Sequence, residues 1–207
     1  PGQSGHLHQS LWNKDGSSAF YDETKEHNMS DTFRHYLAGQ IKLLPEVLAM
    51  IAPTINSYTR MIKGFWAPTH SNWGLDNRTC AIRVIPGSET SHRLEYRIAA
   101  ADSNPYLALA ASIACGLYGI ENKLDLSPMV QGNAYDLDTS LTNLELPNTL
   151  EKSTVAFKNS LVTGELFGKA WVYHFSISRQ WETKCYNKQK KGDPDWHWML
   201  DRYFEII

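Results

Sequence analysis

Arginine is the residue type that stands out in this chain, because most of its arginines fall within one stretch. Five of the eight lie between residues 56 and 105, namely Arg60, Arg78, Arg83, Arg93 and Arg97. A guanidinium group presents a planar fork of donors that can hold a carboxylate or a phosphate through two hydrogen bonds. The chain as a whole has a formal net charge of −2. The arginines are therefore a local concentration and not the mark of a basic protein, and anion binding is one role they could serve.

The arginines are carried by two predicted β-strands. Residues 92–98 alternate charged and apolar side chains, so Arg93, Glu95 and Arg97 share one face while the residues between them face a core. Residues 79–85 predict a second strand with one more arginine. If the strands are neighbours, several guanidinium groups converge on one carboxylate. The residues alone leave two alternatives open, an anion site or a solvated ladder of ion pairs that contributes little.

A third predicted strand, residues 5–12, places His6, His8 and Ser10 on one face. A turn and a return strand at residues 18–21 follow it. A His-x-His pair on a strand is suited to contact a metal ion or a phosphate. The other interpretation is a pair of partly exposed histidines without such a role.

The rest of the pattern predicts helices that support these strands. Apolar residues at helical spacing follow a capping Ser30, and Pro45 divides this segment into two helices. Residues 56–78 are predicted to form a long structured loop. Residues 106–118 are apolar nearly all round, which predicts a buried helix. Further helices are predicted over residues 147–161, 165–186 and 196–205.

Composition excludes several classes of protein. A length of 207 residues fits one domain, or one and a part of another, and an apolar fraction of 42% allows a sizeable core. The near-neutral charge argues against nonspecific nucleic-acid binding. No apolar run is long enough to cross a membrane, and no signal peptide is recognised, although the chain begins at Pro1. Cys80, Cys115 and Cys185 are widely spaced without a Cys-x-x-Cys pair, which predicts reduced thiols in a cytoplasmic protein and no zinc site.

Several short motifs together resemble one family. The stretches HLHQSLW, NSYTR, WAP, DNR before IRV, RLEYR and ADSNPYLALAASIACGL occur in the order and at the spacing of glutamine synthetase of the bacterial type I class. The closing WMLDRYFEII is similar to the end of that family. Residues 1–207 thus resemble the C-terminal segment of its catalytic domain. The resemblance implies an α+β fold in which antiparallel strands of an open barrel are backed by helices. The N-terminal β-grasp domain and the first catalytic strands have no counterpart here.

The resemblance also implies an activity. The expected enzyme is an ATP-dependent ligase that joins the γ-carboxylate of glutamate to ammonia or an amine through γ-glutamyl phosphate. Such phosphoryl transfer depends on positioning and charge neutralisation. The implied cofactor is Mg²⁺ or Mn²⁺, with ATP as co-substrate, and the implied assembly is a homo-oligomeric ring in the cytoplasm. The alternative is a glutamine synthetase-like protein that has lost catalysis and serves as a structural or signalling assembly.

Particular roles follow from the same resemblance. The implied metal ligands are His6 and Glu95. The residues implied to hold glutamate are Arg60, Arg97 and Gly2. The residues implied to contact the nucleotide are His8, Ser10, Arg83 and Arg93. The catalytic residues, which neutralise the phosphates being transferred, are implied to be Arg78 and Arg83.

Some positions depart from the family pattern. Trp66 stands where the family carries a Glu that helps to bind and deprotonate ammonium. An indole cannot take a proton, although its face can attract an ammonium group; the other interpretation is that it packs the loop down. Larger amines are therefore the favoured acceptors.

Two further positions differ or carry a special match. Gly2 follows Pro1 where the family has Asn, and the match could shift to Gly5. Tyr135 occupies the place of a tyrosine that some type I enzymes adenylylate, and here an exposed loop tyrosine without that role is expected.

The expected metal sites are incomplete within this chain. Divalent cations such as Mg²⁺ need several oxygen ligands, and the chain brings only Glu95 together with His6. The chain is therefore expected to be a fragment or a truncated homologue that does not catalyse the reaction by itself.

Overall fold

The computed structural model describes residues 3–137, 145–189 and 195–205 of the chain. The strands of its sheet are β1 (Leu7–Gln9), β2 (Trp73–Leu75), β3 (Ile82–Ile85) and β4 (Arg93–Tyr96). The helices are α1 (Asp31–Ile51), α2 (Pro105–Glu121), α3 (Leu150–Asn159), α4 (Leu161–Phe167), α5 (Lys169–Gln189) and α6 (Asp195–Tyr203). Short 3₁₀ segments are η1 (Glu26–Asn28), η2 (Asn56–Arg60) and η3 (Ala134–Asp136).

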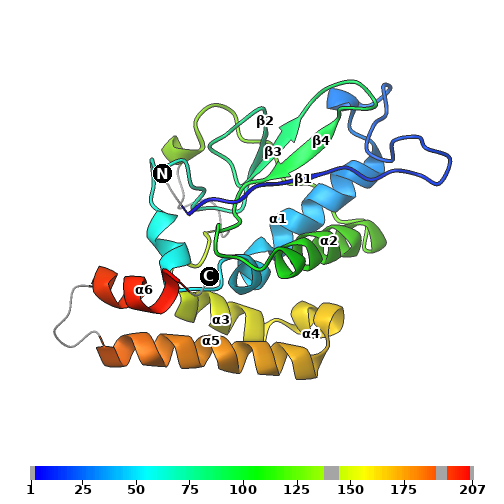
Figure 1. Ribbon diagram of the computed structural model, residues 1–207. Helices are drawn as coiled ribbons and strands as arrows, with labels where there is room; N and C mark the ends of the chain where they lie inside the picture. Colours follow the sequence, from blue (N-terminus) through cyan, green and yellow to red (C-terminus); the bar gives the residue numbers. More distant parts are fainter. Residues whose placement is uncertain (1–2, 138–144, 190–194, 206–207) are drawn as a thin grey trace.

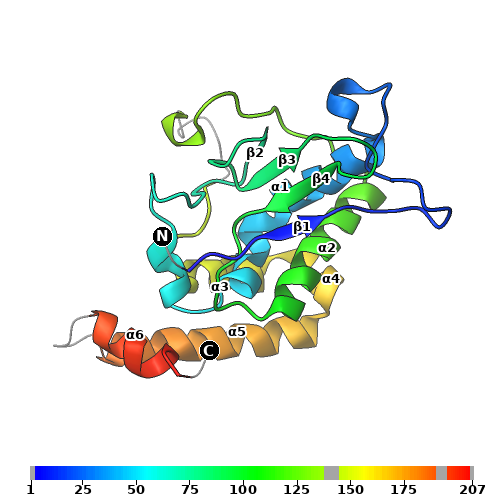
Figure 2. The ribbon, with the colours of Figure 1, turned by 45° about the horizontal axis from the view of Figure 1, so that its top comes forward.

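The elements are stacked in layers (Figure 1). The sheet forms one layer, α1 and α2 pack against each other beneath it, and α3 and α5 lie under α1. The apolar residues of β4, Leu94 and Tyr96, are fully buried in the core that these layers share. Figure 2 shows that the helices gather on one side of the sheet. The opposite face of the sheet is therefore free to carry the charged residues. Among the described residues, no helix has the length and apolar character needed to span a membrane.

The sheet has the strand order β1-β4-β3-β2. The predicted neighbourhood of the two arginine-bearing strands is confirmed, since β3 and β4 pair antiparallel, as do β1 and β4. The prediction of antiparallel strands is wrong for β2, which pairs parallel with β3. Asn72 fixes this register, because its backbone oxygen accepts from the Ile82 amide at 3.0 Å and its side-chain oxygen accepts from the Ala81 amide at 3.0 Å.

Two strand predictions are also corrected. Residues 56–78 contain β2 and η2 as well as loop, and a strand of three residues is too short for its alternation to show. Residues 18–21 form isolated bridges, Trp12 with Ser18 and Tyr21 with Met29, and no continuous return strand.

Helix α1 runs without a break through Pro45, so the predicted division into two helices is wrong. Proline has no amide hydrogen, which leaves the carbonyl four residues earlier without its helical partner. That carbonyl belongs to Ile41, and the hydroxyl of the buried Ser71 donates to it. A residue 30 positions away in sequence thus satisfies the group that proline orphans. The predicted cap is confirmed, because the Phe33 amide donates to the Ser30 hydroxyl.

Helices α1 and α2 approach closely through glycine. A Cβ atom added to Gly39 of α1 would lie 2.1 Å from the Cys115 carbonyl oxygen, and one added to Gly119 of α2 would lie 2.1 Å from the His35 carbonyl oxygen. Among the described residues, one face of α2 makes such contacts. The opposite face exposes large apolar side chains, namely Tyr106, Leu109, Ile113 and Leu117. The prediction that α2 is buried all round is therefore wrong for the described chain.

The helical segment after residue 147 is divided differently from the prediction. Ser160 ends α3 and caps α4, because its hydroxyl accepts from the Thr163 amide at 3.1 Å. Gly168 was predicted inside a helix, but it ends α4 with φ +82°, a conformation that glycine adopts without a steric penalty. Helix α5 begins at the next residue. The predicted closing helix is confirmed as α6.

Candidate active site

Glu95 lies at the centre of the charged face of the sheet. Strand register places His8 of β1 on one side of it and Arg83 of β3 on the other. Because side chains directly across from one another on paired strands point to the same face, the three groups share that face. Arg97 follows two residues later and points the same way, as the alternation predicted. The side chain of Glu95 is almost wholly buried, with the residue only 4% exposed.

Four nitrogen-bearing side chains surround this carboxylate. Arg97 donates to Oε1 at 2.9 Å, and Arg83 donates to Oε2 at 3.2 Å. His6 Nδ1 lies 3.0 Å from Oε1, while His8 Nε2 lies 3.8 Å from the same oxygen. The alternative of a solvated ladder of ion pairs is excluded for Glu95 and Arg97, because both are buried.

The surroundings set the charge of each group. Burial acts to raise the pKa of Glu95, but Arg97 and Arg83 outweigh it and hold that pKa below its usual range. Burial, followed by the charge of Arg97, lowers the pKa of His6. Glu95 is thus a carboxylate and His6 is biased toward its neutral form. These are the states in which the two side chains can bind a cation.

Arg60 is a buried cation without an acidic partner among the described residues. Arg60 is 7% exposed. Its guanidinium donates to the backbone oxygens of Arg97 at 3.2 Å and Trp66 at 3.5 Å. Arg97 is 5% exposed, and its Nε makes no hydrogen bond within the described chain. An uncompensated buried charge is costly. The pair therefore forms a site that favours a bound anion.

The loop between η2 and β2 carries Trp66 beside this pair. Its backbone has a φ of +56°, which is unusual for a bulky residue. The indole is not packed down, because the residue is 56% exposed. The interpretation that Trp66 packs the loop is thus not supported by the described chain, and its ring is open to solvent next to the oxygen that Arg60 contacts.

The remaining predicted residues lie at different distances from this centre. Arg93 donates to His8 Nδ1 at 3.2 Å and to the Ser91 carbonyl at 2.8 Å, so it joins the histidine edge of the site. The Ser10 hydroxyl accepts from the Trp12 indole at 3.0 Å. Arg78 lies on the turn between β2 and β3 with an exposed side chain. Gly2 lies outside the described residues.

The expected metal ion can be tested against the donors present. His6 Nδ1 and Glu95 Oε1 are 3.0 Å apart, close enough to turn toward one ion. Carboxylate oxygen and imidazole nitrogen suit Mn²⁺, and the oxygen suits Mg²⁺. Within the described part of the chain, however, no group of three or more His, Cys, Asp or Glu could hold a metal ion. The two residues therefore fit one side of a coordination shell.

Three features of this region were not predicted from the sequence. Asp76 binds Arg83 at 2.8 Å, although nothing in the sequence pairs them. Tyr135 was predicted as an exposed loop residue, yet its hydroxyl is buried and makes no hydrogen bond to the described residues. Asp102, in the loop after β4, is the third. A half-buried tyrosine in a polar segment leaves no periodic signal, so only the fold shows that its hydroxyl is enclosed.

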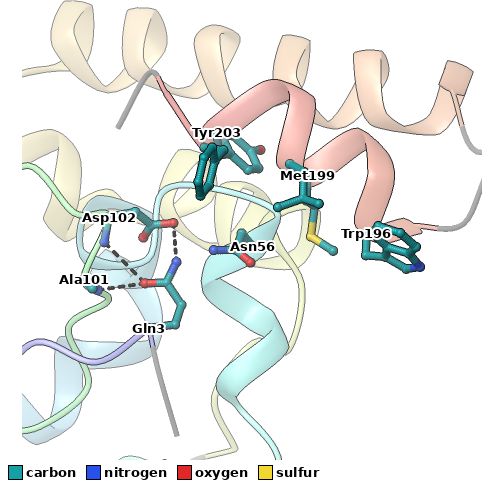
Figure 3. Close-up of a pocket in the computed structure, with 9 residues that line it drawn as sticks. Gln3, Asn56, Ala101, Asp102, Trp196, Met199 and Tyr203 are labelled. Atoms are coloured by element: carbon teal, nitrogen blue, oxygen red, sulfur yellow. Dashed lines mark hydrogen bonds between the residues drawn. The ribbon is translucent and has the colours of Figure 1, made fainter.

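Asp102 ties Gln3 to the segment that carries Arg60. Figure 3 shows its contact with Gln3. Its carboxylate accepts hydrogen bonds from Gln3 at 2.7 Å, Thr54 at 2.5 Å and Ser57 at 2.9 Å. The side-chain oxygen of Gln3 in turn accepts from the backbone amides of Ala101 at 2.9 Å and Asp102 at 3.3 Å. A cavity of about 610 Å³ opens beside this network, between α6 and the loop after β4. Asp102 thus fixes where η2 begins.

Known proteins share the sequence pattern and the architecture of this chain. Residues 1–198 match the family described as "Glutamine synthetase, catalytic domain". The chain belongs to the glutamine synthetase family. It is 45% identical to "Type-1 glutamine synthetase 2" of Dictyostelium discoideum, covering 100% of this chain and 39% of that protein. It is 38% identical to "Glutamate--isopropylamine ligase" of a Pseudomonas species, covering 100% of this chain and 44% of that protein.

A solved structure described as "Apo GmaS without ligand" shares the fold, with a TM-score of 0.81 and 29% identity. The match covers 99% of this chain and 45% of that one. The expected fold is therefore confirmed as that of glutamine synthetase, with a mixed α/β architecture. The chain spans less than half the length of these three proteins.

Proposed function

We propose that this chain is the C-terminal segment of the catalytic domain of an ATP-dependent ligase that joins the γ-carboxylate of glutamate to an amine. The observation that carries the proposal is the pair of buried guanidinium groups, of which Arg60 has no acidic partner within the described residues. A folded protein retains such a charge where an anion completes it. Glutamate is the proposed anion, and the glutamate–isopropylamine ligase among the relatives above supports this choice.

The proposed reaction has two steps. An oxygen of the γ-carboxylate attacks the γ-phosphorus of ATP, and ADP leaves. The amine nitrogen then attacks the acyl carbon, the bond to phosphate breaks and the nitrogen loses a proton. Negative charge builds up on the transferred phosphoryl oxygens, and fixed cations aimed at them lower the barrier. Arg83 is held in place for this by Asp76 and Glu95, and Arg78 is proposed to join it.

The other residues of the face hold the reactants. Arg60 and Arg97 are proposed to hold glutamate, while His8, Ser10 and Arg93 are proposed to contact the nucleotide. His6 and Glu95 would hold one side of a Mg²⁺ or Mn²⁺ ion, which when bound neutralises phosphate charge. The remaining ligands are proposed to come from the N-terminal half. Gly2 is proposed to contact glutamate.

The proposed N-terminal half also bears on the assembly. Both edges of the sheet, β1 and β2, lack a neighbouring strand among the described residues. We propose that strands of the N-terminal half extend this sheet into an open barrel. We also propose that the full-length protein forms a homo-oligomeric ring in the cytoplasm and that the fragment alone is inactive.

Trp66 makes an alkylamine the proposed acceptor. A carboxylate at this position would attract ammonium by charge, whereas an exposed indole offers an apolar face and a π-surface that suit a substituted ammonium group. The first experiment measures ADP release by the full-length protein with ATP, Mg²⁺ and glutamate while the amine is varied among ammonia, methylamine, ethanolamine and putrescine. Turnover with one alkylamine and little with ammonia is expected.

Trp66→Glu supplies the matched variant for this experiment. The expected result is that the ratio of kcat/KM for ammonia to that for the alkylamine rises by about tenfold or more, because a charged acceptor replaces the apolar face. Efficient use of ammonia by the unaltered protein would return it to glutamine synthesis. An assembled protein that turns over none of the amines would instead be a non-catalytic structural or signalling member of the family.

A further inference from the structure

The hydroxyl of Tyr135 is a polar group for which the described chain offers no partner. It is buried without a hydrogen bond, a state that costs free energy unless something else completes it. Tyr135 lies in η3, far from the active-site strands in sequence. The groups that act on the hydroxyl include the guanidiniums of Arg97 and Arg60, the Cys80 thiol and the backbone of Trp66. None of these described groups meets the geometry of a hydrogen bond to the hydroxyl.

The position of Tyr135 is fixed by the sheet. Asn77, on the turn before β3, donates to the Gly132 carbonyl at 2.7 Å. Thr79 accepts from the Ala134 amide at 2.8 Å, and Asn133 accepts from the Tyr135 amide at 3.1 Å. The turn that leads into the Arg83 strand therefore also anchors the tyrosine. Its hydroxyl is held in place on the side of the site where Arg60 and Arg97 lie.

The chemistry of the neighbours decides what could complete this hydroxyl. Guanidinium groups have donors and no acceptor, so neither Arg60 nor Arg97 can take the phenolic proton. Burial raises the pKa of Tyr135, and a neutral phenol keeps that proton available. The acceptor must therefore arrive with the anion that the two arginines attract. A carboxylate offers it, because each of its oxygens can accept more than one hydrogen bond.

We propose that Tyr135 is a substrate-binding residue whose hydroxyl donates a hydrogen bond to a glutamate carboxylate held by Arg60 and Arg97. This inference rests on the proposed function, because it takes glutamate as the anion. It adds a neutral donor to the two guanidinium groups proposed to hold the carboxylate. A neutral donor fixes the direction of the carboxylate, whereas two guanidinium groups alone mainly fix its charge.

The test is Tyr135→Phe in the full-length protein, with Tyr173→Phe as the control because Tyr173 is exposed on α5. Steady-state kinetics should show that KM for glutamate rises by about tenfold or more, since a hydrogen bond to a charged group is lost. The KM values for ATP and for the amine should stay unchanged. Calorimetric titration with glutamate should show the same loss of affinity without turnover. The control should match the unaltered protein in both measurements.

A thermal unfolding scan separates this role from a structural one. Without glutamate, Tyr135→Phe should unfold at the same temperature or higher, because the hydroxyl has no partner in the described chain to lose. Unchanged glutamate affinity in the variant would overturn the inference, as would a rise confined to KM for the amine. If the unaltered protein neither binds glutamate nor turns over any amine, the proposed function itself has failed.

Discussion

Buried charges in this chain fall into two kinds, and the difference lies in their partners. Glu182 of α5 is buried, and Arg202 binds it through two hydrogen bonds of 3.1 and 3.0 Å while the Tyr203 hydroxyl donates at 2.8 Å. The charge of the Glu182 carboxylate is thus balanced by its partners, and these contacts attach α6 to α5. Arg60 is buried to a similar extent, but it has no acidic partner within the described residues. A buried charge without a partner of opposite sign is typical of a binding site, whereas a paired charge is typical of a structural ion pair.

His92 is a residue whose burial predicts acid sensitivity. It is 1% exposed, neither ring nitrogen has a hydrogen bond within the described chain, and the rings of Phe33 and Tyr21 lie edge-on at 5.2 and 5.9 Å. Burial lowers the pKa of His92 in the folded state. The unfolded chain then binds a proton that the folded chain does not. The free energy of unfolding should therefore be unaffected above about pH 6.5 and fall below it, by up to about 1.4 kcal/mol per pH unit.

Urea unfolding at about pH 5.5 and about pH 7.5, on either side of the ordinary histidine pKa, measures this loss. His92→Phe should reduce the difference between the two pH values, because the replacement cannot be protonated. His174→Phe is the control, since His174 is exposed on α5, and it should keep the full difference. An equal pH dependence in His92→Phe and the unaltered protein would show that other groups cause it.

Among the elements, α1 depends on a contact from outside itself. The Ser71 hydroxyl occupies the Ile41 carbonyl that Pro45 leaves open. Ser71→Ala should lower the free energy of unfolding by about 1–3 kcal/mol, because a buried acceptor loses its donor. In a Pro45→Ala background the same change should cost less, since alanine supplies a helical amide hydrogen where proline has none. Denaturant unfolding of the four proteins of this cycle measures the coupling, and equal costs in both backgrounds would contradict it.

The loop after β4 is predicted to hold η2 through Asp102. Asp102→Ala removes the acceptor of three donors, Gln3, Thr54 and Ser57. The free energy of unfolding should fall by about 2–4 kcal/mol, and glutamate affinity should fall with it because Arg60 ends η2. Asp125→Ala, at an exposed position after α2, should change neither quantity. Chemical denaturation and calorimetry report both, and a variant as stable as the control would refute the tie.

The elements also show what the sequence could and could not predict. The alternation around Glu95 correctly divided Arg93 and Arg97 from Leu94 and Tyr96, because a strand has a fixed two-residue period. The parallel pairing of β2 was missed, since three residues carry no readable period. The continuity of α1 through its proline was missed because the compensating serine hydroxyl is a long-range contact. The burial of the Tyr135 hydroxyl in η3 was missed because it too arises from residues distant in sequence.

At the scale of the whole molecule, α2 leaves one apolar face without a partner in the described chain. Tyr106, Leu109, Ile113 and Leu117 form this stripe, and Tyr106 is 82% exposed. Contiguous exposed apolar surface favours association in water. The chain alone should therefore elute as species larger than its 23.5 kDa monomer at concentrations of tens of micromolar.

A variant with Ile113→Glu and Leu117→Lys should shift this chain toward the monomer, because both replacements lie on the exposed face. Its thermal unfolding temperature should stay unchanged, since neither side chain is part of the core. Light scattering coupled to size-exclusion chromatography measures the mass. A monomeric unaltered chain would show that the stripe does not drive association.

The alternation of β4 has a consequence for how its gene can vary. One extra codon or one missing codon between Arg93 and Arg97 would exchange the two faces of the strand. Leu94 and Tyr96 would then stand in the site, and the charged residues would be driven into the core. Substitutions in this stretch alter one group at a time, whereas a shift in length alters all of them together. A library of single-residue insertions and deletions should thus be depleted across β4 far more sharply than across the exposed turn near Gly16.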